Sequence, residues 1–82
     1  MCGAEKLMRA ALDEVSGCFD DDTAENVREL LSSGEPGVAL EILCSQLVEF
    51  DISVSQGVKD LLAESARNMG MDIEELREIR VL

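Results

Sequence analysis

The residue types that most often carry out chemistry in proteins are sparse in this chain. It contains no histidine, which removes the commonest general base and the usual partner of a serine or cysteine nucleophile. Its cysteines are Cys2, Cys18 and Cys44, an odd number at spacings too wide for a zinc site or a disulfide scaffold. We therefore expect no metal and no cofactor, and we expect Cys18 and Cys44 to pack as small apolar residues.

The acidic residues do not form a recognisable catalytic or calcium-binding arrangement either. Glu41 and Glu49 would lie about 12 Å apart along a helix, which is too far for the carboxylate pair of a glycosidase. The run Asp20, Asp21 and Asp22 lacks the alternating ligands and the closing glutamate of a calcium loop. The sequence therefore predicts a protein that is not an enzyme.

Net charge is the strongest feature of the composition. The 82 residues include 18 acidic and 7 basic residues, which gives a net charge of -11. Nucleic acids and anionic membranes attract Lys and Arg, so we expect neither as a partner. The charge favours a basic protein partner, with solubility alone as the alternative explanation. Because the first residues carry several charges and no stretch reaches the length of a membrane span, we expect a cytoplasmic protein.

Hydrophobic periodicity predicts one all-α domain over residues 1–82, a small bundle of about five helices. Apolar residues recur at steps of three and four, as on one face of a helix. Gly34 and Gly70 stand where helices end, and Ser53 or Ser55 stands where one begins. Asp72 opens an apparent capping box for the last helix. The expected helices cover about residues 4–18, 24–32, 36–50 and 56–69, and the last runs from Asp72 to about Arg80.

The helix expected at about residues 36–50 is apolar around most of its circumference. The polar residues that interrupt it form one narrow stripe: Glu41, Ser45 and Glu49, with Gln46 beside it. A helix of this kind packs against neighbours on several sides. We therefore expect it at the centre of the bundle, followed by a short extended connection in which Ile52 and Val54 turn inward.

One family interpretation starts from Phe50-Asp51-Ile52 after a long helix. In a small, acidic, helical protein this pattern looks like an acyl carrier protein. A carrier attaches phosphopantetheine to a serine at the start of that helix, where this chain has Pro36 preceded by Glu35. An acyl-carrier-like protein without its attachment residue stays open as an alternative, as does a general acidic protein-interaction module.

The same region resembles another family more closely. The residues that carry this resemblance are Gly34-Glu35, Ala39-Leu40-Glu41, Leu43-Cys44, Gln46-Leu47, Glu49 and Asp51-Ile52. They are similar to the central motif of MafI-type immunity proteins, and the similarity extends over residues 28–70. The resemblance implies a small helical antitoxin of bacterial competition systems. Such a protein protects its producer from a secreted toxin, usually one with an EndoU-like RNase domain.

The resemblance also implies a basic partner, because the surface of an RNase must hold a polyanion. An acidic protein can cover such a surface by charge complementarity. We expect the chain to be a monomer when free and to bind its toxin one-to-one. The residues expected to contact the toxin are Asp20, Asp21, Asp22, Glu25, Glu41 and Glu49. Helix capping by Asp22 and Glu25, and a merely solvated stripe at Glu41 and Glu49, are the alternative explanations.

Overall fold

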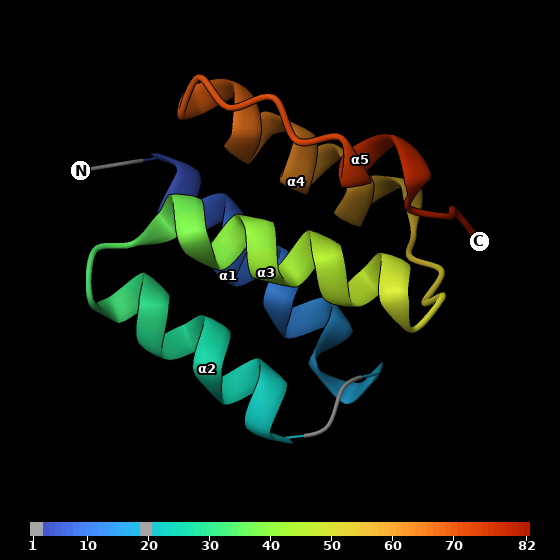
Figure 1. The fold of residues 1–82 in the computed structure, drawn as a ribbon, viewed down its shortest axis with the longest axis horizontal. Coiled ribbons are helices and arrows are strands. Elements are labelled where there is room, and N and C mark those ends of the chain that lie inside the picture. Colours follow the sequence, from blue (N-terminus) through green and yellow to red (C-terminus); the bar gives the residue numbers. More distant parts are fainter. Residues whose placement is uncertain (1–2, 19–20) are drawn as a thin grey trace.

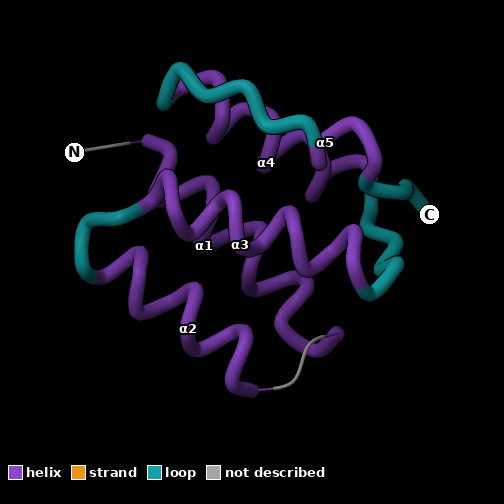
Figure 2. The backbone as a smooth tube through the Cα atoms, in the orientation of Figure 1, coloured by secondary structure: helices purple, strands orange, loops and turns teal. Residues whose placement is uncertain are grey.

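In a computed structural model that describes residues 3–18 and 21–82, five α-helices pack into a small all-α bundle (Figure 1). The helices are α1 (Gly3–Val15), α2 (Asp21–Ser32), α3 (Pro36–Glu49), α4 (Gln56–Asn68) and α5 (Glu75–Glu78), with a short 3-10 helix η1 (Ser16–Cys18) after α1. Figure 2 shows helices over most of the described backbone, joined by loops. The predicted fold class is confirmed. Within the described ranges, no helix is both long and apolar enough to cross a membrane.

Helix α3 lies at the centre of the bundle, as its apolar sequence predicts. It packs against all four other α-helices, and Figure 1 shows it running between α2 on one side and the α4–α5 pair on the other. Leu40, Leu43, Cys44 and Leu47 on α3 are fully buried. Each buried leucine contributes about 1.5–3 kcal/mol to folding. The central helix therefore carries a large share of the core.

The most extensive helix pair is α1 with α4. Ala4 and Ala11 on α1 and Ser65 and Ala66 on α4 are all buried, and such small side chains let two helices approach closely. The Ser65 hydroxyl donates to the Leu61 carbonyl oxygen at 2.8 Å, so this buried polar group is satisfied within its own helix.

The ends of α2, α3 and α4 share one hydrogen-bond pattern, the Schellman motif. At the end of α3, Ile52 N–H donates to the Leu47 carbonyl at 2.9 Å and Asp51 N–H to the Val48 carbonyl at 3.1 Å. The motif needs a residue with positive φ just after the helix, and this residue is usually glycine. After α2 and α4 it is indeed a glycine, as the sequence predicts. After α3 it is Asp51, with φ 53°.

The end of the first helix differs from the prediction. The α-helix ends at Val15, and residues 16–18 form the separate turn η1. Cys18 is therefore not on the buried face of α1, and it is exposed. The prediction that Cys18 packs as a small apolar residue is wrong, whereas Cys44 is buried as predicted.

The last helix is also shorter than predicted. It forms a single turn, Glu75–Glu78, and Glu74 stands at the cap position without a side-chain hydrogen bond. The predicted capping box at Asp72 is therefore wrong. Residues 79–82 are extended and pair with Val54 instead of continuing the helix. Val54 N–H donates to the Arg80 carbonyl, and the Val54 carbonyl accepts from Leu82 N–H, both at 2.9 Å.

Candidate partner-binding surface

Five of the six acidic residues predicted to bind a partner belong to the first turns of α2 or to the polar stripe of α3. Those with described side chains are all exposed: Asp22, Glu25, Glu41 and Glu49. Asp20 lies outside the described residues, and Asp21 is the first residue of α2 with a side chain that also lies outside the description. The structure thus places four of the six predicted residues at the surface of two neighbouring helices.

On α2 these residues form part of a longer acidic stripe. Asp22, Glu25 and Glu29 follow one another at steps of three and four residues, so their side chains lie on one side of the helix. Glu29 is exposed and was not among the predicted contact residues. Its spacing of four residues from Glu25 is the signal that could have identified it. We call the exposed acids of both helices the acidic surface: Asp22, Glu25, Glu29, Glu41 and Glu49.

Two shallow open depressions lie along α2. One has a volume of about 600 Å³ and is lined by residues that include Glu29, Leu30 and Ser33. The other has a volume of about 520 Å³ and lies where η1 approaches α2. Glu25 and Arg28 border both of them. Both depressions are open and have mixed polar and apolar walls, which suit the side chains of a docking protein better than an enclosed small molecule.

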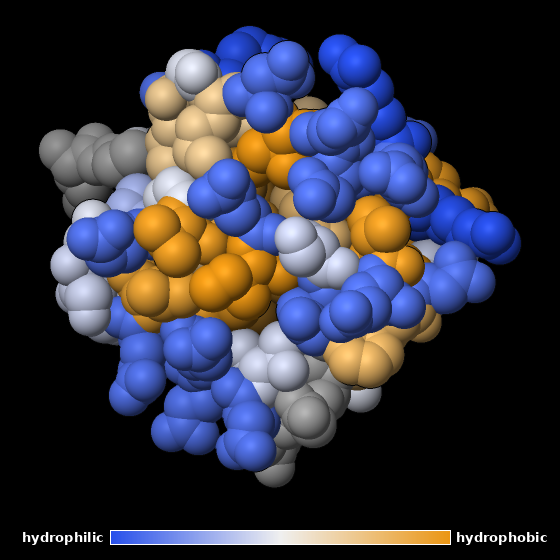
Figure 3. All heavy atoms as spheres, in the orientation of Figure 1, coloured by the Kyte–Doolittle hydropathy of each residue, from blue (hydrophilic) through white to orange (hydrophobic). Residues whose placement is uncertain are grey.

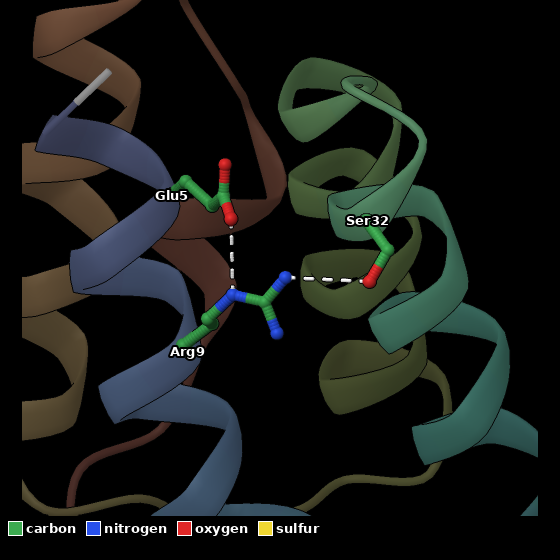
Figure 4. Close-up of polar contacts among 3 residues, drawn as sticks. All are labelled: Glu5, Arg9 and Ser32. Atoms are coloured by element: carbon green, nitrogen blue, oxygen red, sulfur yellow. Dashed lines mark hydrogen bonds and ion pairs between the residues drawn. The ribbon is translucent and has the colours of Figure 1, made fainter. Parts of the chain in front are cut away.

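The arginines near α2 are engaged with acids that are outside the acidic surface. Arg9 on α1 forms an ion pair with Glu5, with Nε and Oε2 3.1 Å apart, and also donates to the Ser32 hydroxyl at 3.4 Å (Figure 4). Arg9 thereby links α1 to the last residue of α2. Arg28 on α2 lies 3.8 Å from the carboxylate of Asp13 on α1. Both contacts connect α1 with α2 and leave the acidic stripe uncompensated.

The remaining three arginines also form ion pairs with acids outside the acidic surface. They pair with acids in the second half of the chain: Arg67 with Glu64, Arg77 with Asp72 and Arg80 with Asp51. Every arginine of the chain thus has an acidic partner, and none of the ion pairs found in the described ranges involves the acidic surface. In addition, α3 contains no basic residue. The electrostatic potential around the exposed acids of α3 is therefore negative, which favours a basic partner.

Apolar side chains also reach the surface beside the acids. Val38 on α3 is exposed, and Leu30 and Ile42 are only partly buried against the core. Figure 3 shows apolar atoms gathered over the first part of α3 with hydrophilic atoms around them. An apolar centre with a charged rim is the usual composition of a protein interface.

The buried thiol on α3 is chemically inert near neutral pH. Burial raises the pKa of Cys44 to about 12, and the carboxylate of Glu75 on α5 adds to the effect. Because only a thiolate is a good nucleophile or metal ligand, this cysteine serves packing. In the described part of the chain, no group of three or more His, Cys, Asp or Glu residues could hold a metal ion.

The start of α3 bears on the carrier alternative. Pro36 is the first residue of the helix, and Glu35 stands at its cap position without a side-chain hydrogen bond. Ser32 ends the preceding helix, and Ser33 lies in the turn that follows it, where both are exposed. The position at which a carrier presents its serine is thus filled by a proline.

Comparison with protein-family models, with curated proteins and with solved structures found no match for this chain.

Proposed function

We propose that this chain is an immunity protein that binds a cognate secreted toxin and neutralises it. The toxin is an EndoU-like RNase, and the chain covers its basic RNA-binding or active-site surface in the cytoplasm of the producing cell. The observation that carries the proposal is the acidic surface of α2 and α3, with which no arginine forms an ion pair among the described residues. The resemblance of residues 28–70 to MafI-type immunity proteins supports it.

The physical basis of this function is competition for one basic surface. An RNase cleft carries Lys and Arg to bind phosphates, and the acidic surface offers carboxylates to the same groups. Long-range attraction raises the rate of encounter and fixes the orientation of the complex. The inhibitor needs no catalytic group, because RNA is excluded once the cleft is covered.

The decisive experiment is a rescue by co-expression. The toxin domain encoded beside the gene for this chain is expressed in a sensitive bacterium, with and without the chain. We expect growth and intact RNA to return, and a one-to-one complex to purify that weakens as salt is added. Continued killing with no complex would overturn the proposal in favour of a general acidic interaction module.

Charge reversal on α2 tests which surface binds. We expect the double variant Asp22→Lys with Glu25→Lys to lose about 10- to 100-fold in affinity for the toxin domain, mainly through slower association. Its affinity should also depend less steeply on salt, because fewer charge pairs remain to be screened. Binding kinetics at several salt concentrations measure both effects.

The matched control carries the same change in net charge elsewhere. Asp60→Lys with Glu74→Lys reverses two exposed acids outside the acidic surface. We expect this control to keep the wild-type affinity to within about threefold, because surface substitutions away from an interface cost little. Equal losses in the two double variants would show that net charge alone governs binding, and would remove α2 from the interface.

A further inference from the structure

Phe50 is an aromatic side chain that the fold leaves at the surface. It follows the last residue of α3, and 61% of it is exposed. The chain has no Trp and no Tyr, the residue types that most often anchor protein interfaces together with Arg. Phe50 is therefore the described residue best able to supply a large rigid contact.

The backbone around Phe50 is fixed. Phe50 N–H donates to the Gln46 carbonyl at 3.0 Å, and the Schellman motif closes over it through the next two residues. Asp51 takes a positive φ, which residues other than glycine rarely do, and its carboxylate lies 3.0 Å from Nε of Arg80. Because the backbone here is already ordered, binding through Phe50 costs little additional backbone entropy.

Two further apolar residues are exposed at the same end of the molecule. Val81 is paired with Val54, and Asp51 forms an ion pair with Arg80. Figure 1 shows the C-terminal segment beside the loop that follows α3. Val81 and Leu82 are both exposed. We call Phe50, Val81 and Leu82 the Phe50 end.

We propose that Phe50 is the apolar anchor of the toxin-binding surface, and that it enters an apolar pocket rimmed by basic side chains on the toxin. This inference rests on the proposed function. Charge complementarity favours a basic partner at Phe50, because the adjoining residue Glu49 is exposed and belongs to the acidic surface. The nearby positive charge of Arg80 is neutralised by Asp51. A second copy of this chain would bring the same negative charge to the contact and is therefore disfavoured.

The test compares Phe50→Ala with Phe50→Tyr in binding to the purified toxin domain of the rescue experiment. We expect Phe50→Ala to weaken binding at least about 10-fold through faster dissociation, because truncating a hot-spot aromatic empties its pocket. The salt dependence should stay that of the wild type, since no charge is lost. Phe50→Tyr keeps the ring and should restore affinity to within about threefold.

Asn68→Ala is the matched control, because Asn68 is an exposed, uncharged residue at the end of α4, outside the acidic surface and the apolar residues beside it. We expect it to bind to within about threefold of wild type. If Phe50→Ala also binds like wild type while the α2 charge reversal weakens binding, the anchor is refuted and the immunity function stands. If the wild-type chain does not bind the toxin domain, both are refuted. Thermal unfolding checks that Phe50→Ala is folded.

Discussion

The acids of α2 and α3, in the first half of this molecule, differ from the arginines of the second half, from α4 to residue 82, in whether they meet a partner of opposite charge. In the second half the arginines have acidic partners: Arg67 lies 2.8 Å from Glu64, and Arg80 lies 3.0 Å from Asp51. Lys59 donates to the Ile79 carbonyl at 2.8 Å and so holds the extended segment against α4. On α2 and α3, by contrast, the acids point to solvent with no ion pair among the described contacts.

This difference separates charges that support the fold from charges that do not. Each exposed ion pair contributes only up to about 1 kcal/mol, yet together they connect α1 with α2 and the end of α3 with residues 79–82. Among the described contacts no ion pair involves the stripe on α2, and its like charges repel one another. The proposed toxin would supply the opposite charges that this stripe does not meet in those contacts.

The largest change in stability is expected with pH, from the ionisation of Cys44 on α3, whose pKa is also raised by Glu75 on α5. Burial raises the pKa of Cys44 from 9.0 to about 12, so between these values the unfolded thiol is ionised and the folded thiol is protonated. Unfolding then releases a proton, and the free energy of unfolding falls as pH rises. We expect Cys44 to account for a loss on the order of 1–2 kcal/mol between pH 9 and pH 10.5. Urea unfolding at a series of pH values measures it.

Cys44→Ala provides the control for this pH dependence. The variant has no thiol at this position to titrate, so its stability should fall less steeply above pH 9, even though the smaller side chain lowers stability at every pH. Parallel curves for wild type and Cys44→Ala would contradict the expected role of the buried thiol.

Asp51 tests how the second half uses its ion pairs. Asp51→Ala removes the pair with Arg80 and places an alanine at positive φ, and we expect a loss of about 1 kcal/mol. Asp51→Gly loses the same pair but relieves the backbone strain, so its stability should stay within about 0.5 kcal/mol of wild type. Thermal unfolding distinguishes the two. A glycine variant as unstable as the alanine variant would show that the ion pair, not the backbone, dominates.

The fold follows from the sequence wherever a local signal and the tertiary structure agree. Pro36 begins α3, Gly34 and Gly70 provide positive φ after their helices, and the Ser55 hydroxyl accepts from Val58 N–H at the start of α4. The last helix is the exception. Residues 79–82 gain more from pairing with Val54 than from continuing a helix, and that partner is distant in the sequence.

Part of the acidic surface can also be predicted from local signals in the sequence. The polar stripe of α3 marks Glu41 and Glu49 as exposed because the rest of the helix is apolar. The sequence could not show that each arginine pairs away from these acids, because two of the five described pairs, Arg28 with Asp13 and Arg80 with Asp51, join residues far apart in the chain. Nor could it show that Phe50 faces solvent, since this depends on the turn formed by Asp51.

The smallest predicted effects are two changes in stability, one in each half of the molecule. They test the difference between the halves most directly, because they should have opposite signs. Glu29→Gln relieves repulsion from Glu25 four residues earlier and should raise stability by about 0.2–0.5 kcal/mol, or about 1–2 °C in Tm. Glu64→Gln removes the contact with Arg67 at 2.8 Å but also the repulsion from Asp60 four residues earlier, so it should lower stability by at most about 0.5 kcal/mol. Both shifts should shrink in about 1 M salt, which screens exposed charges.

Matched thermal unfolding of the two glutamine variants at low salt measures these shifts. The two substitutions are chemically identical and both sites are exposed, so any difference in sign comes from the neighbouring charges. A fall in stability for both variants would mean that Glu29 has a stabilising contact within the chain, and the acidic stripe would then need no partner to explain it. A rise for Glu29→Gln together with weaker toxin binding would show the same carboxylate opposing the fold and supporting the complex.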